Sequence, residues 1–466
     1  MSDVLFVYPN IFNIPVHPEF DRYERLMLQF AEERELVGLA RGTIVPPTAL
    51  LLLSAYLKEH QVATSFLDLT VECCEGKDKH EALLAALQKE DPLVVAVNGM
   101  EDCFLSELYD IARVTKRYNE TITVVTGGVS ATTRDVEILT TSLVDFVVRG
   151  EGEQTLLSLV QALMRGNGVE SVRGLSGIQE GRLLRTEDRP FMDVTTLPLP
   201  DRENYPLARL YALNGGVDLI YASRGCSGSC AFCNAPGYWK RVWRAREPGK
   251  VVEELARLEE MGATSVHIYD LNFGLDKRWV AEICAGVRKE RLEIVWDCEL
   301  ALHDFTKPFL QTLYDGNCRG AFCGIEAVNQ LVLDSVHKSY RSHDLMRYLR
   351  TAKAAGIHVD GGYIFGLPED TDQGLQALTR LAGKLLEEDL VETPAPFLFV
   401  PFLGTEIGDD PARSGIEIVN QNTEEWHFFP PNPLASTRYL SAEKVHREWA
   451  RCLTNVSNIL ESKLGT

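Results

Sequence analysis

The sequence has no apolar run long enough to cross a bilayer. A membrane-spanning helix needs about 20 apolar residues. The longest apolar runs, Thr48–Leu57 and Pro394–Leu403, are each only about half that length. The first residues, MSDVLFVYPN, include the acid Asp3 and no basic segment, so they look like a buried strand and not a signal peptide. We therefore expect a cytoplasmic protein with no membrane partner.

Positive charge is scarce as well. The 466 residues include 67 acidic and 47 basic ones, which gives a formal net charge of −20. This balance excludes a generally basic nucleic-acid binder. Hydrophobic residues make up 45% of the chain and charged residues 24%, values that exclude wholesale disorder. The composition is that of a large globular protein, and we expect no nucleic-acid partner.

Nothing in the sequence favours disulfide bonds. There are eleven cysteines, an odd number, and no export signal accompanies them. Most are scattered along the chain, as small buried hydrophobic residues are. Only Cys226, Cys230 and Cys233 form a tight, regular group.

Residues 1–170 predict a doubly wound α/β sheet. Strand-like apolar runs cover residues 4–8, 65–69, 93–98, 122–126 and 144–148, and helical patterns separate them. Strands separated by helices of this length predict a parallel, Rossmann-like sheet. Residues 171–215 contain the Pro-rich segment TLPLPDRENYP and predict a linker.

A second alternating series occupies residues 216–403. Its strand candidates are residues 219–223, 265–269, 293–298, 320–324, 358–364 and 396–400. Six βα units predict a partial (β/α)6, TIM-like barrel, because a complete eight-unit barrel needs about 250 residues. Residues 404–466 predict a small, mostly helical C-terminal cap.

The cysteine group follows the first strand of this second series. It reads Cys226-Ser-Gly-Ser-Cys230-Ala-Phe-Cys233, a C-x3-C-x2-C spacing in one loop. A [4Fe–4S] cluster normally takes four cysteines, so three would leave one iron open to another ligand. A structural zinc site needs a fourth protein ligand, and no adjacent Cys or His supplies one. The spacing therefore favours an open-iron cluster held by these three thiolates.

The triad, its place after the first strand and the aromatic Phe232 before the third cysteine resemble the radical S-adenosylmethionine (radical SAM) superfamily. The resemblance implies that the open iron binds S-adenosylmethionine and that an electron from the cluster cleaves it to a 5′-deoxyadenosyl radical. It also implies an external electron donor such as a flavodoxin or ferredoxin.

Residues after the later strands extend the resemblance to the adenosylmethionine site. Those that would contact this cofactor are Phe232, Asp270, Asn272, Glu326, Gly362, Ile364, Gly366 and Glu369. The segment around Asp270 departs from the family, because the glycines of its GGE-like motif are absent. The basic stretch Tyr238–Arg246 follows the triad, and its cations Lys240, Arg241, Arg244 and Arg246 are candidates for an anionic cofactor or substrate.

The N-terminal sheet resembles the cobalamin-binding domain of the cobalamin-dependent branch of that superfamily. Segments PPTALLLLSAYL, TGGVS and VRGEGEQT carry the resemblance. It implies a cobalamin site at the carboxyl ends of the strands, formed by Asn98, Gly99, Gly127, Gly128, Ser130, Glu151 and Glu153. The D-x-H-x-x-G motif that supplies a cobalt ligand is absent, and His17 does not replace it. We therefore expect base-off cobalamin without a His lower ligand.

The resemblance implies a cobalamin-dependent radical SAM enzyme that methylates an unactivated carbon of a small-molecule or natural-product substrate. One alternative is a radical SAM enzyme that catalyses cyclisation or rearrangement, with cobalamin used differently or absent. A second alternative is a non-catalytic cobalamin or redox sensor. The substrate and the catalytic residues that contact it have no marker in the sequence.

Overall fold

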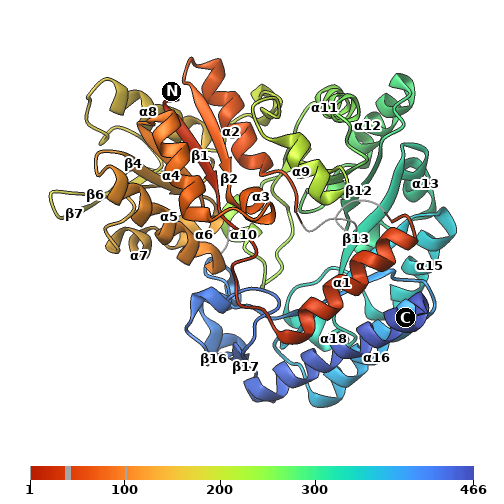
Figure 1. The fold of residues 1–466 in the computed structure, drawn as a ribbon. Coiled ribbons are helices and arrows are strands. Elements are labelled where there is room, and N and C mark those ends of the chain that lie inside the picture. The colour runs from red at the N-terminus through yellow and green to blue at the C-terminus, as the bar shows by residue number, and fades with distance from the viewer. Residues whose placement is uncertain (1, 37–43, 100–101, 466) are drawn as a thin grey trace. The chain divides into compact units, whose positions relative to one another are not determined.

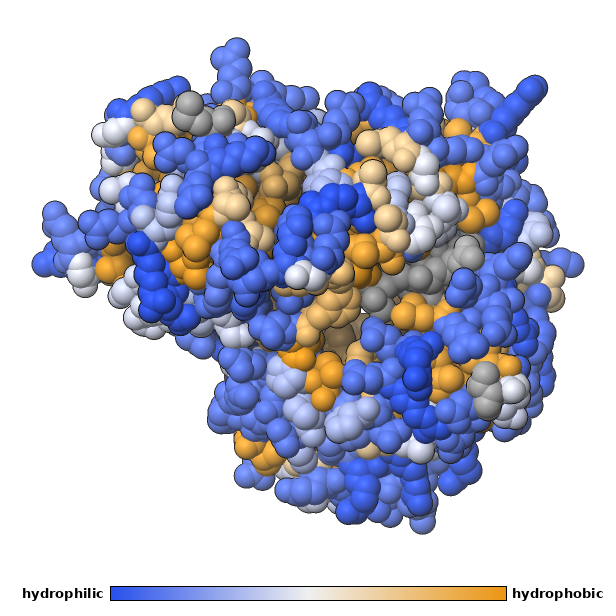
Figure 2. All heavy atoms as spheres, in the orientation of Figure 1, coloured by the Kyte–Doolittle hydropathy of each residue, from blue (hydrophilic) through white to orange (hydrophobic). Residues whose placement is uncertain are grey.

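The structure, a computed structural model, describes residues 2–36, 44–99 and 102–465. The chain forms two compact units, each with its own hydrophobic core. Unit 1 contains residues 1–14 and 47–213, and unit 2 contains residues 15–46 and 214–466 (Figure 1). Hydrophilic residues dominate the visible face, and hydrophobic ones form only small separate patches (Figure 2).

Unit 1 is built on a seven-stranded sheet of order β2-β1-β3-β4-β5-β6-β7. The first five strands are parallel, in the 2-1-3-4-5 order of flavodoxin-like folds. The strands are β1 (Val4–Tyr8), β2 (Thr64–Asp68), β3 (Val94–Asn98), β4 (Thr123–Gly127), β5 (Phe146–Val148), β6 (Leu175–Gln179) and β7 (Arg182–Arg185). The prediction of a doubly wound parallel sheet is confirmed.

Alternate residues of the strands pack against helices on opposite faces of the sheet. Val4 and Phe6 share a core with residues of α2 (Thr48–Glu59) and α8 (Glu153–Met164). Leu5 and Val7 share the other core with residues of the helices on the second face. The helices on that face are α4 (Lys79–Glu90), α5 (Leu105–Tyr118) and α7 (Asp135–Thr140), with the short α3 (Leu69–Cys74) and α6 (Val129–Thr133) at strand ends. Near-continuous apolar strands fit this two-sided burial.

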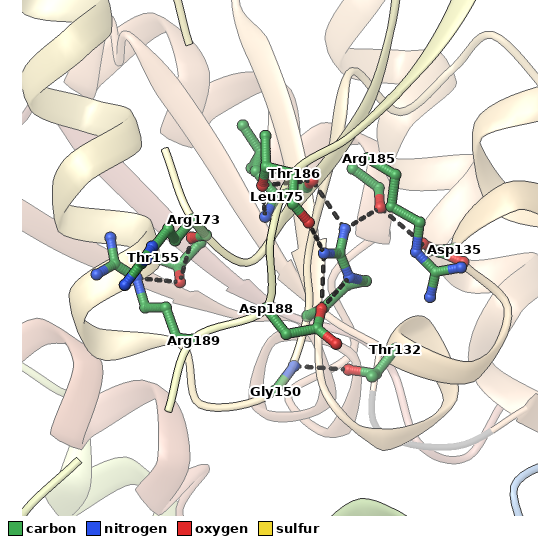
Figure 3. A network of polar contacts seen from close by, with 12 residues as sticks. Thr132, Asp135, Gly150, Thr155, Arg173, Leu175, Arg185, Thr186, Asp188 and Arg189 are labelled. Atoms are coloured by element: carbon green, nitrogen blue, oxygen red, sulfur yellow. Dashed lines mark hydrogen bonds and ion pairs between the residues drawn. The ribbon is translucent and has the colours of Figure 1, made fainter. Parts of the chain in front are cut away.

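The expectation of an irregular linker at residues 171–215 is wrong in its first part. Strands β6 and β7 form an antiparallel hairpin that extends the sheet beyond β5. Its two-residue turn, Glu180–Gly181, has positive φ at both positions, as tight hairpins require. Arg149 fastens the hairpin by donating to the carbonyl oxygens of Leu175 and Thr186 and to the Asp188 carboxylate. Figure 3 labels these three acceptor residues.

Unit 2 is built on a six-stranded, fully parallel sheet of order β15-β14-β13-β12-β11-β8. The strands are β8 (Val217–Ile220), β11 (Ser265–Ile268), β12 (Val295–Glu299), β13 (Cys318–Glu326), β14 (His358–Phe365) and β15 (Thr393–Leu398). Helices α11 (Pro248–Glu260), α12 (Lys277–Glu290), α13 (Lys307–Asp315), α15 (Leu345–Ala355) and α16 (Asp372–Glu387) connect the strands. The predicted partial six-stranded barrel is confirmed.

The two faces of this sheet differ in chemistry. Trp296, Cys298 and Val359 share the apolar core with the surrounding helices. His267 and Asp297 point to the opposite face of the sheet and are also buried. There His267 Nδ1 lies 2.8 Å from Asp297 Oδ2, within hydrogen-bond distance. Burial lowers the pKa of His267, but the carboxylates of Asp297 and Glu299 outweigh it and raise this pKa to about 10. Polar side chains therefore line one face, which a barrel encloses.

The predicted helical C-terminal region is confirmed, and it packs as part of unit 2. Helix α18 (Ala442–Leu464) packs against α16, β14 and β15 and lies beside α1 (Pro18–Glu33) (Figure 1). The Arg22 guanidinium of α1 binds the Glu461 carboxylate of α18 at 2.8 Å. The two compact units thus divide the chain at residues 14, 46 and 213, the last within two residues of the predicted boundary at 215.

Shorter elements complete the two units. They are α9 (Leu207–Asn214), β9 (Ser223–Arg224), α10 (Ala235–Trp239), β10 (Arg244–Ala245), α14 (Gln330–Ser335), α17 (Glu406–Asp409), β16 (Glu417–Ile418) and β17 (Ala435–Ser436). None of the described helices combines the length with the apolar character that a transmembrane segment requires.

Candidate functional site

The three clustered cysteines lie in one loop at the carboxyl end of β8, residues Gly225 to Asn234, which we call the cysteine loop. Gly225 opens it with φ +87°, and a Cβ there would collide with the carbonyl oxygen of Val242, so the position needs glycine. The thiols of Cys226, Cys230 and Cys233 are all free and half-buried.

Backbone amides already point at two of the sulfur atoms. The Gly228 N–H donates to Cys226 Sγ at 3.3 Å, and the Ala235 N–H donates to Cys233 Sγ at 3.4 Å. Such bonds favour the thiolate form, which binds iron. A Cβ at Gly228 would lie 3.3 Å from Cys226 Sγ, so the glycine keeps this approach open. The donor set fits an iron–sulfur cluster.

No three His, Cys, Asp or Glu residues in the described part of the chain are arranged to hold a single metal ion. Zinc draws four ligands to one point, whereas a cubane attaches each cysteine to a different iron.

Two segments after later strands hold the cysteine loop. Beyond β13, the carbonyl oxygen of Val336 accepts from the Ala231 N–H at 3.1 Å, and His337 Nδ1 lies 3.2 Å from the Ser229 carbonyl oxygen. Beyond β15, the Ile407 N–H donates to the Ala231 carbonyl oxygen at 3.1 Å. The loop is therefore shaped by the fold before any cofactor binds.

The residues predicted after β11 have structural partners. Asp270 is 1% exposed, and its Oδ1 accepts from the backbone N–H groups of Ala222 and Ser223, both at 2.9 Å. Burial raises the pKa of Asp270 to about 6. Asn272 caps the following turn by accepting from the Gly274 N–H at 3.1 Å. Asp270 thus anchors the strand end that leads into the cysteine loop.

Glu326 lies at the carboxyl end of β13 with φ +60°, an uncommon conformation for a residue with a side chain. Its carboxylate binds the Lys338 ammonium at 2.6 Å. Lys338 also lies 5.9 Å from the centre of the Phe232 ring in the cysteine loop. Burial would lower the pKa of Lys338, but Glu326 and Cys230 outweigh it and raise this pKa.

The structure therefore brings Glu326 and Phe232 together through a residue that the sequence did not mark. Lys338 follows α14 in the segment VHKSY, which matches no motif. Lys338 lies twelve residues beyond Glu326 in the sequence, and only the folded chain brings its ammonium to the Glu326 carboxylate.

The segment after β14 forms a tight turn. Gly366 has φ +95°, and a Cβ would lie 2.7 Å from a Val445 methyl group. The N–H groups of Gly366 and Leu367 both donate to Asp370 Oδ2 at 3.1 Å. Burial raises the pKa of Asp370, also unmarked in the sequence, to about 7. Asp370 holds this turn in shape.

Of the other predicted residues, Gly362 and Ile364 lie within β14 and Glu369 lies beyond its end. A Cβ at Gly362 would lie 3.0 Å from the Phe322 ring, and Ile364 is 8% exposed two residues further on. The Glu369 carboxylate, in contrast, accepts from the Tyr439 hydroxyl at 3.0 Å and faces Arg438 at 3.5 Å. It ties down the C-terminal segment in this structure.

The four cations of the basic stretch differ in their surroundings. Arg246 is buried and donates to the Glu254 carboxylate and the Tyr221 carbonyl oxygen. Arg244 stacks on Trp239, 5.5 Å from the ring centre. Lys240 and Arg241 are exposed.

In unit 1 the predicted glycines meet where β3 and β4 end. The Gly99 N–H donates to the Gly127 carbonyl oxygen at 2.9 Å, and Asn98 pairs with Gly127 in register. Gly128 has φ +118° and begins the turn into α6, which contains the buried Ser130. A Cβ at Gly99 would lie 2.6 Å from Thr126 Oγ1. The backbone is closely packed at this edge.

The two predicted glutamates follow β5, one on each side of Gly152. The Glu151 carboxylate accepts from the Met192 N–H at 2.9 Å, and Glu153 is buried in the first turn of α8. His17 belongs to unit 2, where it caps α1 and packs against Trp449.

Family models match both units. A B12-binding domain model matches residues 34–160, and a radical SAM superfamily model matches residues 220–382. The second match runs from β8 through the cysteine loop to α16. The chain contains a radical SAM domain and a B12-binding domain.

Individual proteins of similar sequence or structure match between 74% and 98% of this chain. An uncharacterized methyltransferase of Pyrococcus horikoshii is 28% identical over 91% of this chain and 90% of its own. The anaerobic magnesium-protoporphyrin IX monomethyl ester cyclase of Rubrivivax gelatinosus is 27% identical over 74% of this chain and 62% of its own. The solved structure of the radical SAM methyltransferase TsrM from Kitasatospora setae superposes with a TM-score of 0.72 at 18% identity, covering 98% and 89% of the two chains. That likeness concerns the fold.

Proposed function

We propose that this radical SAM protein is a cobalamin-dependent enzyme that methylates an unactivated carbon of a small-molecule substrate. The observation that carries the proposal is the three-thiol cysteine loop, held by the ends of a six-stranded partial barrel, in a chain with a B12-binding domain. Methyltransferase relatives of similar length support the type of reaction.

The cofactors would divide between the two units. Cys226, Cys230 and Cys233 would hold a [4Fe–4S] cluster, and the strand ends of unit 1 around Gly99, Gly127 and Gly128 would hold cobalamin. When bound, the cluster supplies one electron to cleave S-adenosylmethionine, and cobalamin supplies a transferable methyl group.

The polar residues after β13 and β14 would position S-adenosylmethionine. Glu326 would accept from the ribose hydroxyls, and the Lys338 ammonium, which already faces a carboxylate, would bind the carboxylate of the methionine portion. The turn at Gly366, kept in shape by Asp370, would present backbone groups to the adenine. Asp270 has a supporting role, because its Oδ1 accepts from the backbone N–H groups of Ala222 and Ser223 before the cysteine loop.

A cyclisation reaction is the second candidate. The observation in its favour is the cyclase relative, which is 27% identical over 74% of this chain. Both reactions need the cluster and S-adenosylmethionine, so the cysteine loop serves either one. They differ in whether a methyl group reaches cobalamin and then the product.

The test uses the full chain, reconstituted anaerobically with iron, sulfide and hydroxocobalamin. A strong reductant and S-adenosylmethionine with a deuterated methyl group are then added. We expect 5′-deoxyadenosine and deuterated methylcobalamin on the protein. Absence of 5′-deoxyadenosine from cluster-loaded protein would contradict both enzymatic proposals. Formation of 5′-deoxyadenosine without any bound cobalamin would favour cyclisation or rearrangement.

The matched variants are Cys230→Ala and Cys74→Ala. Cys230 is a proposed iron ligand, whereas Cys74 is an exposed thiol at the end of α3. Cys230→Ala should lose the visible absorbance of the cluster and nearly all 5′-deoxyadenosine, and Cys74→Ala should keep both. A full cluster in Cys230→Ala would refute the ligand assignment.

A further inference from the structure

An exposed basic turn, residues Lys240–Val242, follows α10 and lies against the cysteine loop. All three residues are exposed, and Val242, an apolar residue, is 41% exposed. Lys240 and Arg241 have φ of +52° and +60°, the only two successive non-glycine residues with positive φ in the described chain. Such backbone conformations are costly and cluster at functional sites.

One peptide group connects this turn to a proposed iron ligand. Arg241 Nε donates to the Ser227 carbonyl oxygen at 3.4 Å. The same peptide continues through the Gly228 N–H, which donates to Cys226 Sγ at 3.3 Å. A second contact lies beside it, where the Val242 carbonyl oxygen closely approaches Gly225. The exposed guanidinium is therefore two hydrogen bonds and one peptide group away from the thiol.

The charge of the turn is unbalanced. No carboxylate lies within 4 Å of Lys240 or Arg241 among the residues that the structure describes, although the chain has 67 acidic residues. Arg246, from the same stretch, is buried against Glu254. Two cations without a carboxylate partner, beside an exposed valine, favour an acidic partner protein, because charge complementarity speeds and orients the encounter of two proteins.

We propose that the Lys240–Val242 turn is the docking surface for a small acidic one-electron carrier protein that reduces the cluster. This inference rests on the proposed function, because it needs the cluster. One electron passes from the reduced carrier to the oxidised cluster, so the carrier is oxidised by one electron and the cluster reduced by one. The small area suits the transient contacts of electron-transfer pairs.

The test compares two reductants of the reconstituted full chain in stopped-flow experiments. Flavodoxin hydroquinone represents the acidic carrier, and photoreduced deazaflavin represents a small uncharged reductant. In the double variant Lys240→Glu, Arg241→Glu, reduction of the cluster by flavodoxin should slow roughly 10- to 100-fold at low ionic strength. The difference should shrink as salt is added, and reduction by deazaflavin should keep its wild-type rate.

A matched control changes two cations at the opposite end of the barrel strands. Lys289 is 82% exposed, and Arg291 is an exposed residue with φ +57° that precedes β12. Lys289→Glu, Arg291→Glu makes the same change of net charge, and flavodoxin should reduce it at close to the wild-type rate.

Other outcomes overturn the proposal. An unchanged flavodoxin rate in the Lys240–Arg241 variant would show that the carrier docks elsewhere. An equal loss with both reductants would show that the turn only shapes the cysteine loop. If flavodoxin reduced the control variant equally slowly, the change in net charge alone would explain the slower reduction. A wild-type cluster that deazaflavin cannot reduce would instead contradict the proposed function, which separates the two failures.

Discussion

At the scale of single residues, Asp270 shows how a buried carboxylate can shape a site without contacting its ligand. It accepts hydrogen bonds from the N–H groups of Ala222 and Ser223, which lie just before the cysteine loop. Asp270→Ala leaves both buried donors unpaired, each at a cost of about 1–3 kcal/mol. We expect this variant to retain less than half of the wild-type iron after reconstitution, measured per chain by a colorimetric assay.

Asp270→Asn is the matched control, because its amide oxygen can still accept both bonds. It should retain iron at the wild-type level. If Asp270→Ala also did so, the carboxylate would not be needed to place the loop.

The same pair gives a prediction for pH. Burial raises the pKa of Asp270 from 3.8 to about 6, so the unfolded chain releases this proton first as pH rises. The contribution of Asp270 to stability therefore falls between about pH 4 and pH 6 and levels off above. The melting temperature of Asp270→Asn relative to wild type should rise over this interval, and a constant difference would contradict the raised pKa.

At the scale of elements, Arg149 carries the attachment of the β6–β7 hairpin to the sheet. Arg149→Met removes its bonds to the carbonyl oxygens of Leu175 and Thr186 and to the Asp188 carboxylate. The Leu175 oxygen keeps the N–H and hydroxyl of Thr186 as donors, whereas the Thr186 oxygen loses its charged donor. We expect the free energy of unfolding of unit 1 to fall by about 2–3 kcal/mol, measured by urea denaturation.

Arg173→Met is the control in the same network. Arg173 and Glu187 form an ion pair at 2.8 Å whose side chains are 52% and 73% exposed. Its loss should cost less than about 1 kcal/mol, because exposed pairs contribute little. Equal effects of the two substitutions would contradict the assigned role of Arg149.

The elements that the sequence predicted are those with local, periodic patterns. Apolar runs separated by amphipathic helices identified the parallel strands of both units. The β6–β7 hairpin was missed because Pro-rich residues nearby suggested a linker, although Glu180–Gly181 between two alternating runs is a turn signal. Helix α1 was not predicted, although Pro18 at its start and its apolar spacing mark it.

The same division holds for the site. Cys226, Cys230 and Cys233 could be predicted because their spacing within one loop is a local property. The pairing of Glu326 with Lys338 depends on a left-handed residue at a strand end, and the bonds of Asp270 to Ala222 and Ser223 join different strands. Such contacts arise only when the sheet is formed, so a single sequence does not reveal them.

At the scale of the whole molecule, the chain passes between its two units three times, after residues 14, 46 and 213. Strand β1 lies inside the sheet of unit 1, between β2 and β3, while α1, which follows it, belongs to unit 2. The N-terminal 46 residues therefore contribute to both cores, and a linear division into consecutive domains does not describe the protein.

This arrangement predicts which strands and helices lose stability when a buried contact of α1 is removed. The Tyr23 hydroxyl donates to the carbonyl oxygen of Pro394 in β15 at 2.8 Å, and both groups are buried. Tyr23→Phe leaves that acceptor unpaired, at a cost of about 1–3 kcal/mol. Because all recorded partners of Tyr23 lie in unit 2, hydrogen exchange should quicken in β14, β15 and α18 and stay unchanged in β1, β3 and β4.

The control for this last prediction is Tyr118→Phe, a tyrosine of unit 1 that is 38% exposed. It should leave exchange unchanged in both units. Faster exchange of β1 and β3 in Tyr23→Phe would show that the units open as one, because the shared N-terminal segment would then couple them. Exchange confined to unit 2 would mean that the segment contributes to each core separately, as the independent hydrophobic clusters imply.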